Sequence, residues 1–220
     1  MKLDDLLKDK KAVIFDLDGT LIDSMGLWTD IDREYLGRHG YELPDDYQAA
    51  IAGMSFYETA VYSRERFRIN DTVEKIMQDW NDMAMDKYAN HVPLKEGVRD
   101  FLPALKRRGI LTGIATSNSM ELVDACLDHL GVRHLFDEIH TSGEVAHGKP
   151  APDIYLLVAE TLGVKPDRCI CFEDIPEGLT AGRSAGMMTV AVDDAYSSNL
   201  TLKKKELSDF FIKDYRDIEL

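Results

Sequence analysis

The stretch Ala12–Thr20, which reads AVIFDLDGT, places a short apolar run directly before a turn that carries two aspartates. Four consecutive apolar residues bounded by polar ones are typical of a strand that is buried on both faces. Asp16 and Asp18 stand where that strand ends, and Gly19 supplies the backbone freedom that a turn needs. The stretch therefore predicts a buried strand with two carboxylates at its carboxyl end.

Further apolar runs of the same kind follow, separated by segments with helical spacing. They are Ile110–Ala115, Cys169–Phe172 and Met188–Val192, and Glu138–His140, in which only Ile139 is apolar, is a weaker strand signal between the first two. Apolar residues recur at three- and four-residue intervals within 97–108, within 122–130 and after Pro152. Continuous apolar strands that alternate with helices indicate an α/β fold with a parallel sheet covered on both faces.

Residues 24–90 break that alternation and contain no strand pattern. Leu27, Ile31 and Tyr35 form one helical stripe, and Ser55–Glu58 and Asp71–Glu74 both resemble capping boxes that open helices. We expect an α/β core made of residues 1–22 and 91–220, with residues 23–90 inserted as a helical unit. The chain would cross between the two near 21–24 and 90–96, where hinges could lie.

Composition limits the partners of this protein. The 220 residues include 40 acidic and 26 basic side chains, for a formal net charge of −14. Phosphate backbones and anionic membranes attract basic surfaces, so we expect neither nucleic acid nor membrane as a partner. The N-terminus lacks the apolar stretch of a signal peptide, and the three cysteines form no disulfide framework. These features predict a cytoplasmic protein, and they leave its oligomeric state open.

The polar residues that follow the strands carry the candidate chemistry. They are Asp16 and Asp18 after the first strand, Thr116 after the second, Glu173 and Asp174 after the fourth, and Lys149 in the loop before the Pro152 helix. Because ligands collect at the carboxyl ends of parallel strands, we expect these groups to converge. Converging carboxylates repel one another unless a hard cation binds them, and Mg²⁺ suits a few carboxylates together with a phosphate. Lys149 and Thr116 would complete an anion site.

These residues also resemble the four motifs of the haloacid dehalogenase superfamily, in the same order. The resemblance covers residues 11–193 and is strongest to the β-phosphoglucomutase-like branch, whose signatures match Lys149–Asp153 and Glu173–Gly178. It implies a Rossmann-like parallel-sheet core with an inserted α-helical cap domain. A nucleotide-binding P-loop is excluded, because Gly143–Lys149 is followed by Pro150 where that motif needs serine or threonine.

The resemblance implies a role for each site residue. Asp16 would be the nucleophile that forms an aspartyl-phosphate, and Asp18 would be the general acid and base. The groups that bind phosphate or substrate would be Thr116, Ser117, Asn118 and Lys149. Mg²⁺ would be held by Asp16, by Asp18 through its backbone carbonyl, and by Asp174, with Glu173 either a further ligand or an orienting group behind them.

Two departures from the branch favour a phosphatase over a mutase. Trp28 replaces a histidine, and Phe56 replaces the arginine that would grip the far phosphate of a bisphosphate. We therefore expect a magnesium-dependent phosphatase that acts on a small phosphorylated metabolite, with sugar phosphates as candidates. A phosphosugar mutase and a non-catalytic phosphometabolite-binding protein remain alternatives. Trp28 and Phe56 either pack within the cap or contact substrate.

Overall fold

A six-stranded parallel sheet forms the centre of the molecule, and the computed structural model describes all of residues 1–220. The strand order is β3-β2-β1-β4-β5-β6, so the aspartate-bearing first strand lies near the middle. The strands are β1 (Ala12–Phe15), β2 (Leu111–Thr116), β3 (Glu138–Thr141), β4 (Cys169–Glu173), β5 (Met188–Val192) and β6 (Phe210–Ile212). All five predicted strands are confirmed. The sixth, β6, was not predicted, because it is a three-residue edge strand with only Ile212 fully buried.

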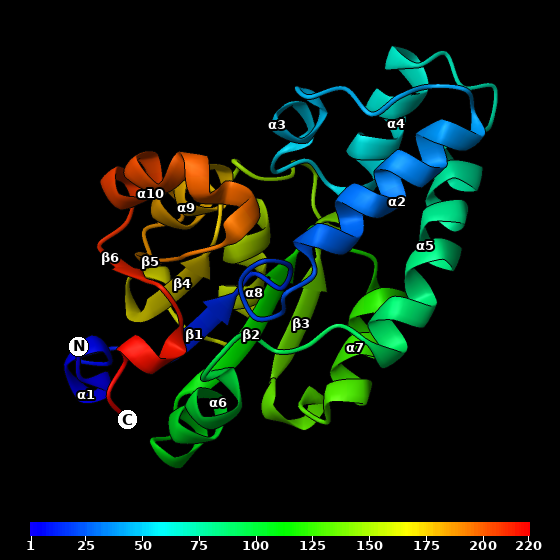
Figure 1. Cartoon of the computed structure of the whole chain (residues 1–220). Helices are drawn as coiled ribbons and strands as arrows, with labels where there is room; N and C mark the ends of the chain where they lie inside the picture. Colours follow the sequence, from blue (N-terminus) through cyan, green and yellow to red (C-terminus); the bar gives the residue numbers. More distant parts are fainter.

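Helices cover both faces of this sheet (Figure 1). Side chains alternate along β1, so Val13 and Phe15 face one layer while Ala12 and Ile14 face the other. The first layer contains α6 (Val98–Arg107) and α7 (Met120–Leu130), and the second contains α8 (Asp153–Thr161) and α9 (Pro176–Ser184). The short α1 (Leu3–Leu6) and α10 (Thr201–Leu207) complete the core. The α/β core with helices on both faces is as predicted.

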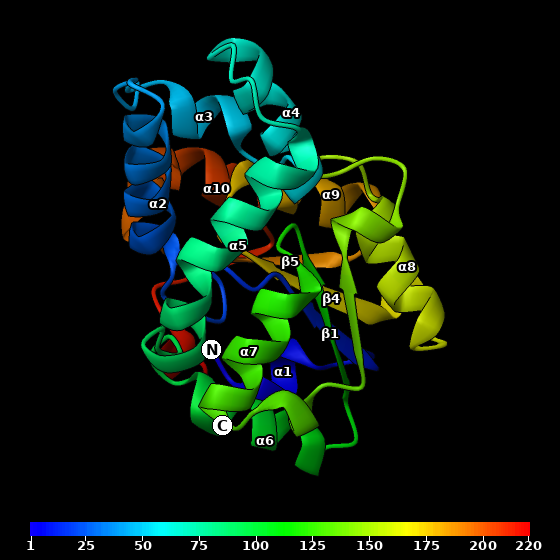
Figure 2. The ribbon, with the colours of Figure 1, turned by 90° about the vertical axis from the view of Figure 1, so that its right-hand side faces the viewer.

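Four helices inserted between β1 and β2 form the cap, beyond the carboxyl ends of the strands (Figure 1). They are α2 (Met25–Arg38), α3 (Tyr47–Ile51), α4 (Phe56–Arg66) and α5 (Val73–Asn90). The predicted capping box at Ser55 is present, with both of its hydrogen bonds to Glu58. The second predicted capping box, Asp71–Glu74, is wrong. Thr72 is the N-cap residue of α5, and its hydroxyl accepts a hydrogen bond from the backbone N–H of Lys75. The long helix α5 packs against α7 of the core (Figure 2).

The two crossings between core and cap lie side by side. The N–H of Asp23 donates to the carbonyl of Pro93 at 3.0 Å, and the N–H of Lys95 donates to the carbonyl of Leu21 at 2.9 Å. Both crossings are therefore joined to each other by backbone hydrogen bonds. The exact division into residues 1–22, 23–90 and 91–220, and any hinge motion there, remain predictions.

The interior is apolar and contains all three cysteines. Cys169 and Cys171 point to the same face of β4, where they pack among the residues that α8 and α9 bury. Cys126 is buried in the opposite layer. No helix is both long and apolar enough to cross a membrane.

Candidate active site

Lys149 joins two strands through its ammonium group at the carboxyl edge of the sheet. Its Nζ lies 2.6 Å from Oδ1 of Asp16, which follows β1, and 2.5 Å from Oε1 of Glu173, the last residue of β4. All three side chains are buried. The sequence placed these residues 133 and 24 positions apart, and the parallel pairing of β1 with β4 brings them into direct contact.

Glu173 is held rigidly by its surroundings. Oε1 also accepts a hydrogen bond from the hydroxyl of Tyr155 at 2.7 Å, and Oε2 accepts one from the N–H of Asp174 at 3.2 Å. The first turn of α9 passes directly over the carboxylate, and a Cβ on Gly178 would lie 1.9 Å from it. The Glu-Asp-x-x-x-Gly spacing thus has a steric cause: only glycine leaves room for Glu173.

Asp174 presents an oxygen that the protein leaves without a partner. Its Oδ1 accepts a hydrogen bond from Thr20 at 3.2 Å, whereas the buried Oδ2 has none. Oxygen atoms of Asp16, Glu173 and Asp174 lie within 4.8 Å of one another. An all-oxygen set with an unpaired buried carboxylate oxygen fits a hard divalent cation, because such a cation would supply the missing partner. The three residues therefore fit a divalent metal site, as the sequence predicted for this edge of the sheet.

Electrostatics at this edge is dominated by burial and by close charges. Burial raises the pKa of Asp16 to about 7 against the opposing charge of Lys149. Burial also raises the pKa of Asp174, and the neighbouring Asp16 and Glu173 carboxylates raise it further. Burial alone would lower the pKa of Lys149, but the two carboxylates outweigh it and raise that pKa. Lys149 is therefore a permanent cation, and a bound divalent cation would favour the ionised forms of both aspartates.

Asp18 has hydrogen-bond partners of its own, which it does not share with the Lys149 cluster. Its Oδ1 accepts from the hydroxyl of Ser24 at 2.6 Å and from the hydroxyl of Tyr88, and its Oδ2 accepts from the amide of Asn118 at 2.9 Å. Tyr88 belongs to cap helix α5, and Trp28 of α2 donates to the same Tyr88 hydroxyl at 2.7 Å. The carboxylate is thereby tied to the cap as well as to the core.

The loop after β2 provides polar groups beside Asp16 and Asp18. Thr116 Oγ1 accepts the backbone N–H of Asn118 at 3.1 Å, and the structure shows no acceptor for its own O–H. The carbonyl of Ser117 accepts the backbone N–H of Phe56 at 3.1 Å, so the cap loop touches the core here. The structure thus brings together all eight residues singled out from the sequence. Glu173 lies behind the others, outside the cavity lining.

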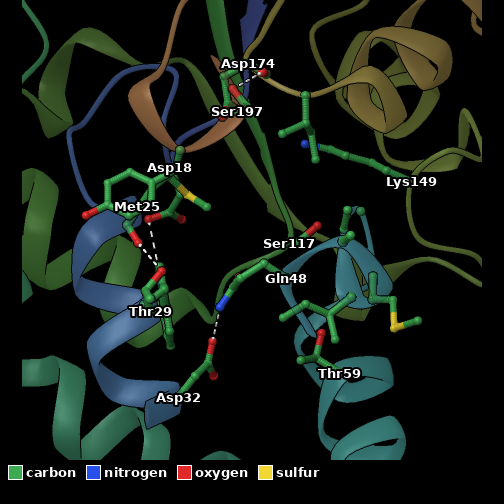
Figure 3. Close-up of a pocket in the computed structure, with 18 of the residues that line it drawn as sticks. Asp18, Met25, Thr29, Asp32, Gln48, Thr59, Ser117, Lys149, Asp174 and Ser197 are labelled. Atoms are coloured by element: carbon green, nitrogen blue, oxygen red, sulfur yellow. Dashed lines mark hydrogen bonds between the residues drawn. The ribbon is translucent and has the colours of Figure 1, made fainter. Parts of the chain in front are cut away.

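A cavity of about 500 Å³ extends from these groups into the cap. Figure 3 shows Asp18, Lys149 and Asp174 at one end and Asp32, Gln48 and Thr59 at the other. Trp28 and Phe56 line it together with Trp80, with ring centroids of Trp28 and Phe56 5.9 Å apart. The predicted packing of these two residues is therefore present, and contact with substrate stays a prediction for the side chains that line the cavity.

Several polar residues of the cavity were not found from the sequence, among them Asp32 and Gln48 of the cap. Asp32 of α2 is buried, and its Oδ2 accepts a hydrogen bond from Gln48 of α3 at 2.7 Å. Asp32 directly follows Ile31 and so lies beside the apolar stripe of α2, not within it. A charged residue at such a position is buried only where another element covers it. The contact between α2 and α3 decides the burial of Asp32, and no sequence motif predicts that contact.

Known proteins resemble this chain over most of its length. The sequence model of the family described as haloacid dehalogenase-like hydrolase matches residues 13–192. Fructose-1-phosphate phosphatase YqaB of Escherichia coli is 34% identical over 195 residues, which cover 82% of this chain and 95% of that protein. The phosphorylated carbohydrates phosphatase of Thermotoga maritima is 31% identical over 177 residues, 80% of this chain and 82% of that protein.

Solved structures share the fold. CbbY from Rhodobacter sphaeroides, in complex with phosphate, superposes with a TM-score of 0.82 at 24% identity, covering 94% of this chain and 95% of that one. The β-phosphoglucomutase of Clostridium difficile gives 0.81 at 23% identity, covering 94% of this chain and 92% of that one.

Proposed function

This chain belongs to the haloacid dehalogenase-like hydrolase family, and on that premise we propose that it is a magnesium-dependent phosphatase of small phosphomonoesters, with sugar phosphates as the main substrates. The observation that carries the proposal is that Asp16 lines the cavity, is paired with Lys149 and lies close to Asp174, whose Oδ2 has no partner. Such an arrangement can bind and attack a phosphoryl group.

The proposed reaction has two steps. A carboxylate oxygen of Asp16 attacks phosphorus, the ester P–O bond breaks, and Asp18 gives its proton to the leaving oxygen. Water then attacks the phosphorus of the aspartyl-phosphate, loses a proton to Asp18 and releases inorganic phosphate, which restores the Asp16 carboxylate. Lys149 stabilises negative charge on the phosphoryl oxygens and on Asp16 throughout. Thr116 donates its free O–H to a phosphoryl oxygen, and Ser117 and Asn118 complete the rim.

Mg²⁺ is the cation we assign to the carboxylate cluster. Its ligands would be Asp16, Asp174 and the backbone carbonyl of Asp18, while Glu173, whose oxygens already accept three hydrogen bonds, orients Lys149 and Asp174. When bound, the ion supplies charge that offsets the phosphate and orients it for in-line attack.

The cap favours hydrolysis over phosphoryl transfer between sugar positions. A mutase must hold a second phosphate far from Asp16, and arginine or lysine does this best. The residues that line the cavity include Lys149 as their only basic side chain, and the cap contributes Asp32 and Asp45 instead. Two relatives in sequence also support hydrolysis: the Escherichia coli protein is a fructose-1-phosphate phosphatase, and the Thermotoga maritima protein is a phosphatase of phosphorylated carbohydrates.

A cytoplasmic location is part of the proposal, and three buried free thiols support it.

Release of inorganic phosphate tests the proposal. Purified protein with Mg²⁺ is expected to hydrolyse an aryl phosphate and a panel of sugar phosphates, and Asp16→Asn is expected to abolish the reaction. Full activity in that variant would remove Asp16 from the role of nucleophile. Isomerised sugar phosphate without phosphate release, dependent on a bisphosphate activator, would favour the mutase. Binding without turnover in the wild type would favour a non-catalytic protein.

A further inference from the structure

The cap end of the cavity carries polar groups that take no part in the proposed phosphoryl chemistry. Thr29 and Asp32 come from α2, Gln48 from α3 and Thr59 from α4 (Figure 3). Three separate helices thus direct polar side chains into one space, away from Asp16 and Lys149. Each of these side chains makes only one hydrogen bond within the protein, and a cap that served packing alone would fill that space with apolar side chains.

Asp32 is the least explained of these groups. It is only 5% exposed, and its one side-chain partner is the neutral amide of Gln48. No lysine or arginine contacts it, and burial raises the pKa of its carboxyl to about 6. Buried carboxylates without a cation are destabilising, and a cavity-facing group of this kind is a candidate for ligand contact.

The unpaired atoms at this end are mostly acceptors. Oδ1 of Asp32 and Oε1 of Gln48 accept no hydrogen bond from the protein. A ligand that displaces water must therefore bring O–H or N–H donors to both, or the acceptors stay buried and unpaired. The charge at this end is negative, from Asp32 and the neighbouring Asp45, so a second phosphate or a carboxylate would be repelled.

The dimensions and the remaining lining fit a short hydroxylated carbon chain. A volume of about 500 Å³ holds a monosaccharide-sized ligand with its phosphate. Trp28, Phe56 and Trp80 supply flat apolar walls on which the C–H groups of such a chain can pack. The hydroxyls of Thr29 and Thr59 donate to the carbonyls of Met25 and Ser55, so towards a ligand they add two more acceptors.

We propose that Asp32 and Gln48 form a hydroxyl-binding subsite, and that the substrates are monophosphates of polyols or sugars with free hydroxyls remote from the phosphate. Two ligand hydroxyls donate to Asp32 and to Oε1 of Gln48, while the phosphate lies at Lys149. This subsite rests on the proposed phosphatase function and deepens it by naming the part of the substrate that the cap recognises.

The ratio of two specificity constants tests the subsite. We would measure kcat/KM for a hexitol monophosphate and for 4-nitrophenyl phosphate, which has no aliphatic hydroxyl, in the wild type and in Asp32→Ala. Losing a hydrogen bond to a charged acceptor is expected to lower the hexitol-to-aryl ratio at least about tenfold. Gln48→Leu is expected to lower it in the same direction and by less, because a neutral acceptor is lost.

Asp30 provides the matched control. It lies on the same helix, is exposed and is paired with Arg33, so Asp30→Ala should leave the ratio unchanged. Circular dichroism and the melting temperature check that each variant is folded. If Asp32→Ala is not folded, the isosteric Asp32→Asn replaces it in the measurement. In Asp32→Asn the ratio should also fall, since the charge of the acceptor is lost.

The outcomes separate the two levels of the proposal. If the wild type hydrolyses both substrates but the ratio does not change in the folded Asp32 variant, the subsite is refuted and the phosphatase function stands. A wild type that prefers an aminoalkyl phosphate to the hexitol phosphate would also refute it, because the carboxylates would then serve as counter-ions to an amine. If the wild type hydrolyses no phosphomonoester, the proposed function fails and the subsite fails with it.

Discussion

Replacing Asp32 by asparagine should make the protein more stable near neutral pH and change little in acid. The side chain keeps its size and can still accept the hydrogen bond from Gln48, but it no longer has to be ionised in a buried place. Burial raises the pKa of this carboxyl from 3.8 to about 6, and the hydrogen bond from Gln48 only partly opposes that.

The magnitude follows from that shift. An acid whose pKa is higher in the folded state binds its proton more tightly there, so the stability contributed by this site falls as pH rises between about 4 and 6. Well above pH 6 the penalty is about 3 kcal/mol, at about 1.4 kcal/mol for each pKa unit. Near pH 5 it is about 1.5 kcal/mol, and below about pH 3.8 it disappears. Asp32→Asn relieves that penalty.

Urea denaturation of both proteins at about pH 5 and about pH 7.5, followed by tryptophan fluorescence, measures the effect as a difference in unfolding free energy. Other groups that titrate, such as Asp16, contribute equally to both proteins and cancel in the difference. Asp30→Asn is the control, since an exposed side chain in an ion pair should change stability by less than about 0.5 kcal/mol at either pH.

The decisive quantity is how the gain depends on pH. A gain that grows by about 1.5 kcal/mol from the lower to the higher pH supports the buried, ionised carboxylate. A difference that is the same at both pH values would show that Asp32 does not titrate in this range. If Asp32→Asn instead lowers the stability, and does so more at higher pH, Asp32 is paired with a cation in the wild type. That result would refute the reasoning, because no lysine or arginine contacts Asp32.

Three further outcomes concern the core end of the site. Gly178→Ala should lower the melting temperature and the activity together, because its Cβ would meet the Glu173 carboxylate at 1.9 Å; overpacking of this kind typically costs about 1–3 kcal/mol. Tyr88→Phe removes one of the hydrogen bonds that hold Asp18, and kcat should fall about tenfold with a smaller change in KM, measured by phosphate release. Mg²⁺ should raise the melting temperature, because it relieves repulsion among buried carboxylates, and Asp174→Asn should remove most of that rise in thermal melts.

Matched variants separate these effects from general damage. Gly37→Ala lies in a helix with open space around the new methyl group and should not destabilise the protein. Tyr57→Phe changes an exposed tyrosine of the cap and should leave kcat unaltered. Asp167→Asn, at an exposed aspartate, should keep the full response to Mg²⁺. Equal effects in a control and its partner would contradict the corresponding prediction.

The core end of the site could be predicted from local sequence because its residues follow strands. Asp16 and Thr116 each end an apolar run, and a parallel sheet brings all carboxyl ends to one edge whatever the length of chain between them. The spacing of the apolar residues and the polar residues that bound them were enough to find those runs. Glu173 shows the limit of this reasoning: its place at the edge followed from sequence, but its three hydrogen bonds did not.

The cap end was decided by tertiary structure alone. A helical pattern shows which face of α2 is apolar but not which element will cover it, and Asp32 is buried only because α3 brings Gln48 against it. Tyr88 likewise reaches Asp18 because α5 packs on α7. Strand ends converge by the geometry of one sheet, whereas separate helices meet through side-chain packing. The sequence by itself therefore determined which polar groups meet at the edge of the sheet, and the packing of the cap decided which groups lie opposite them.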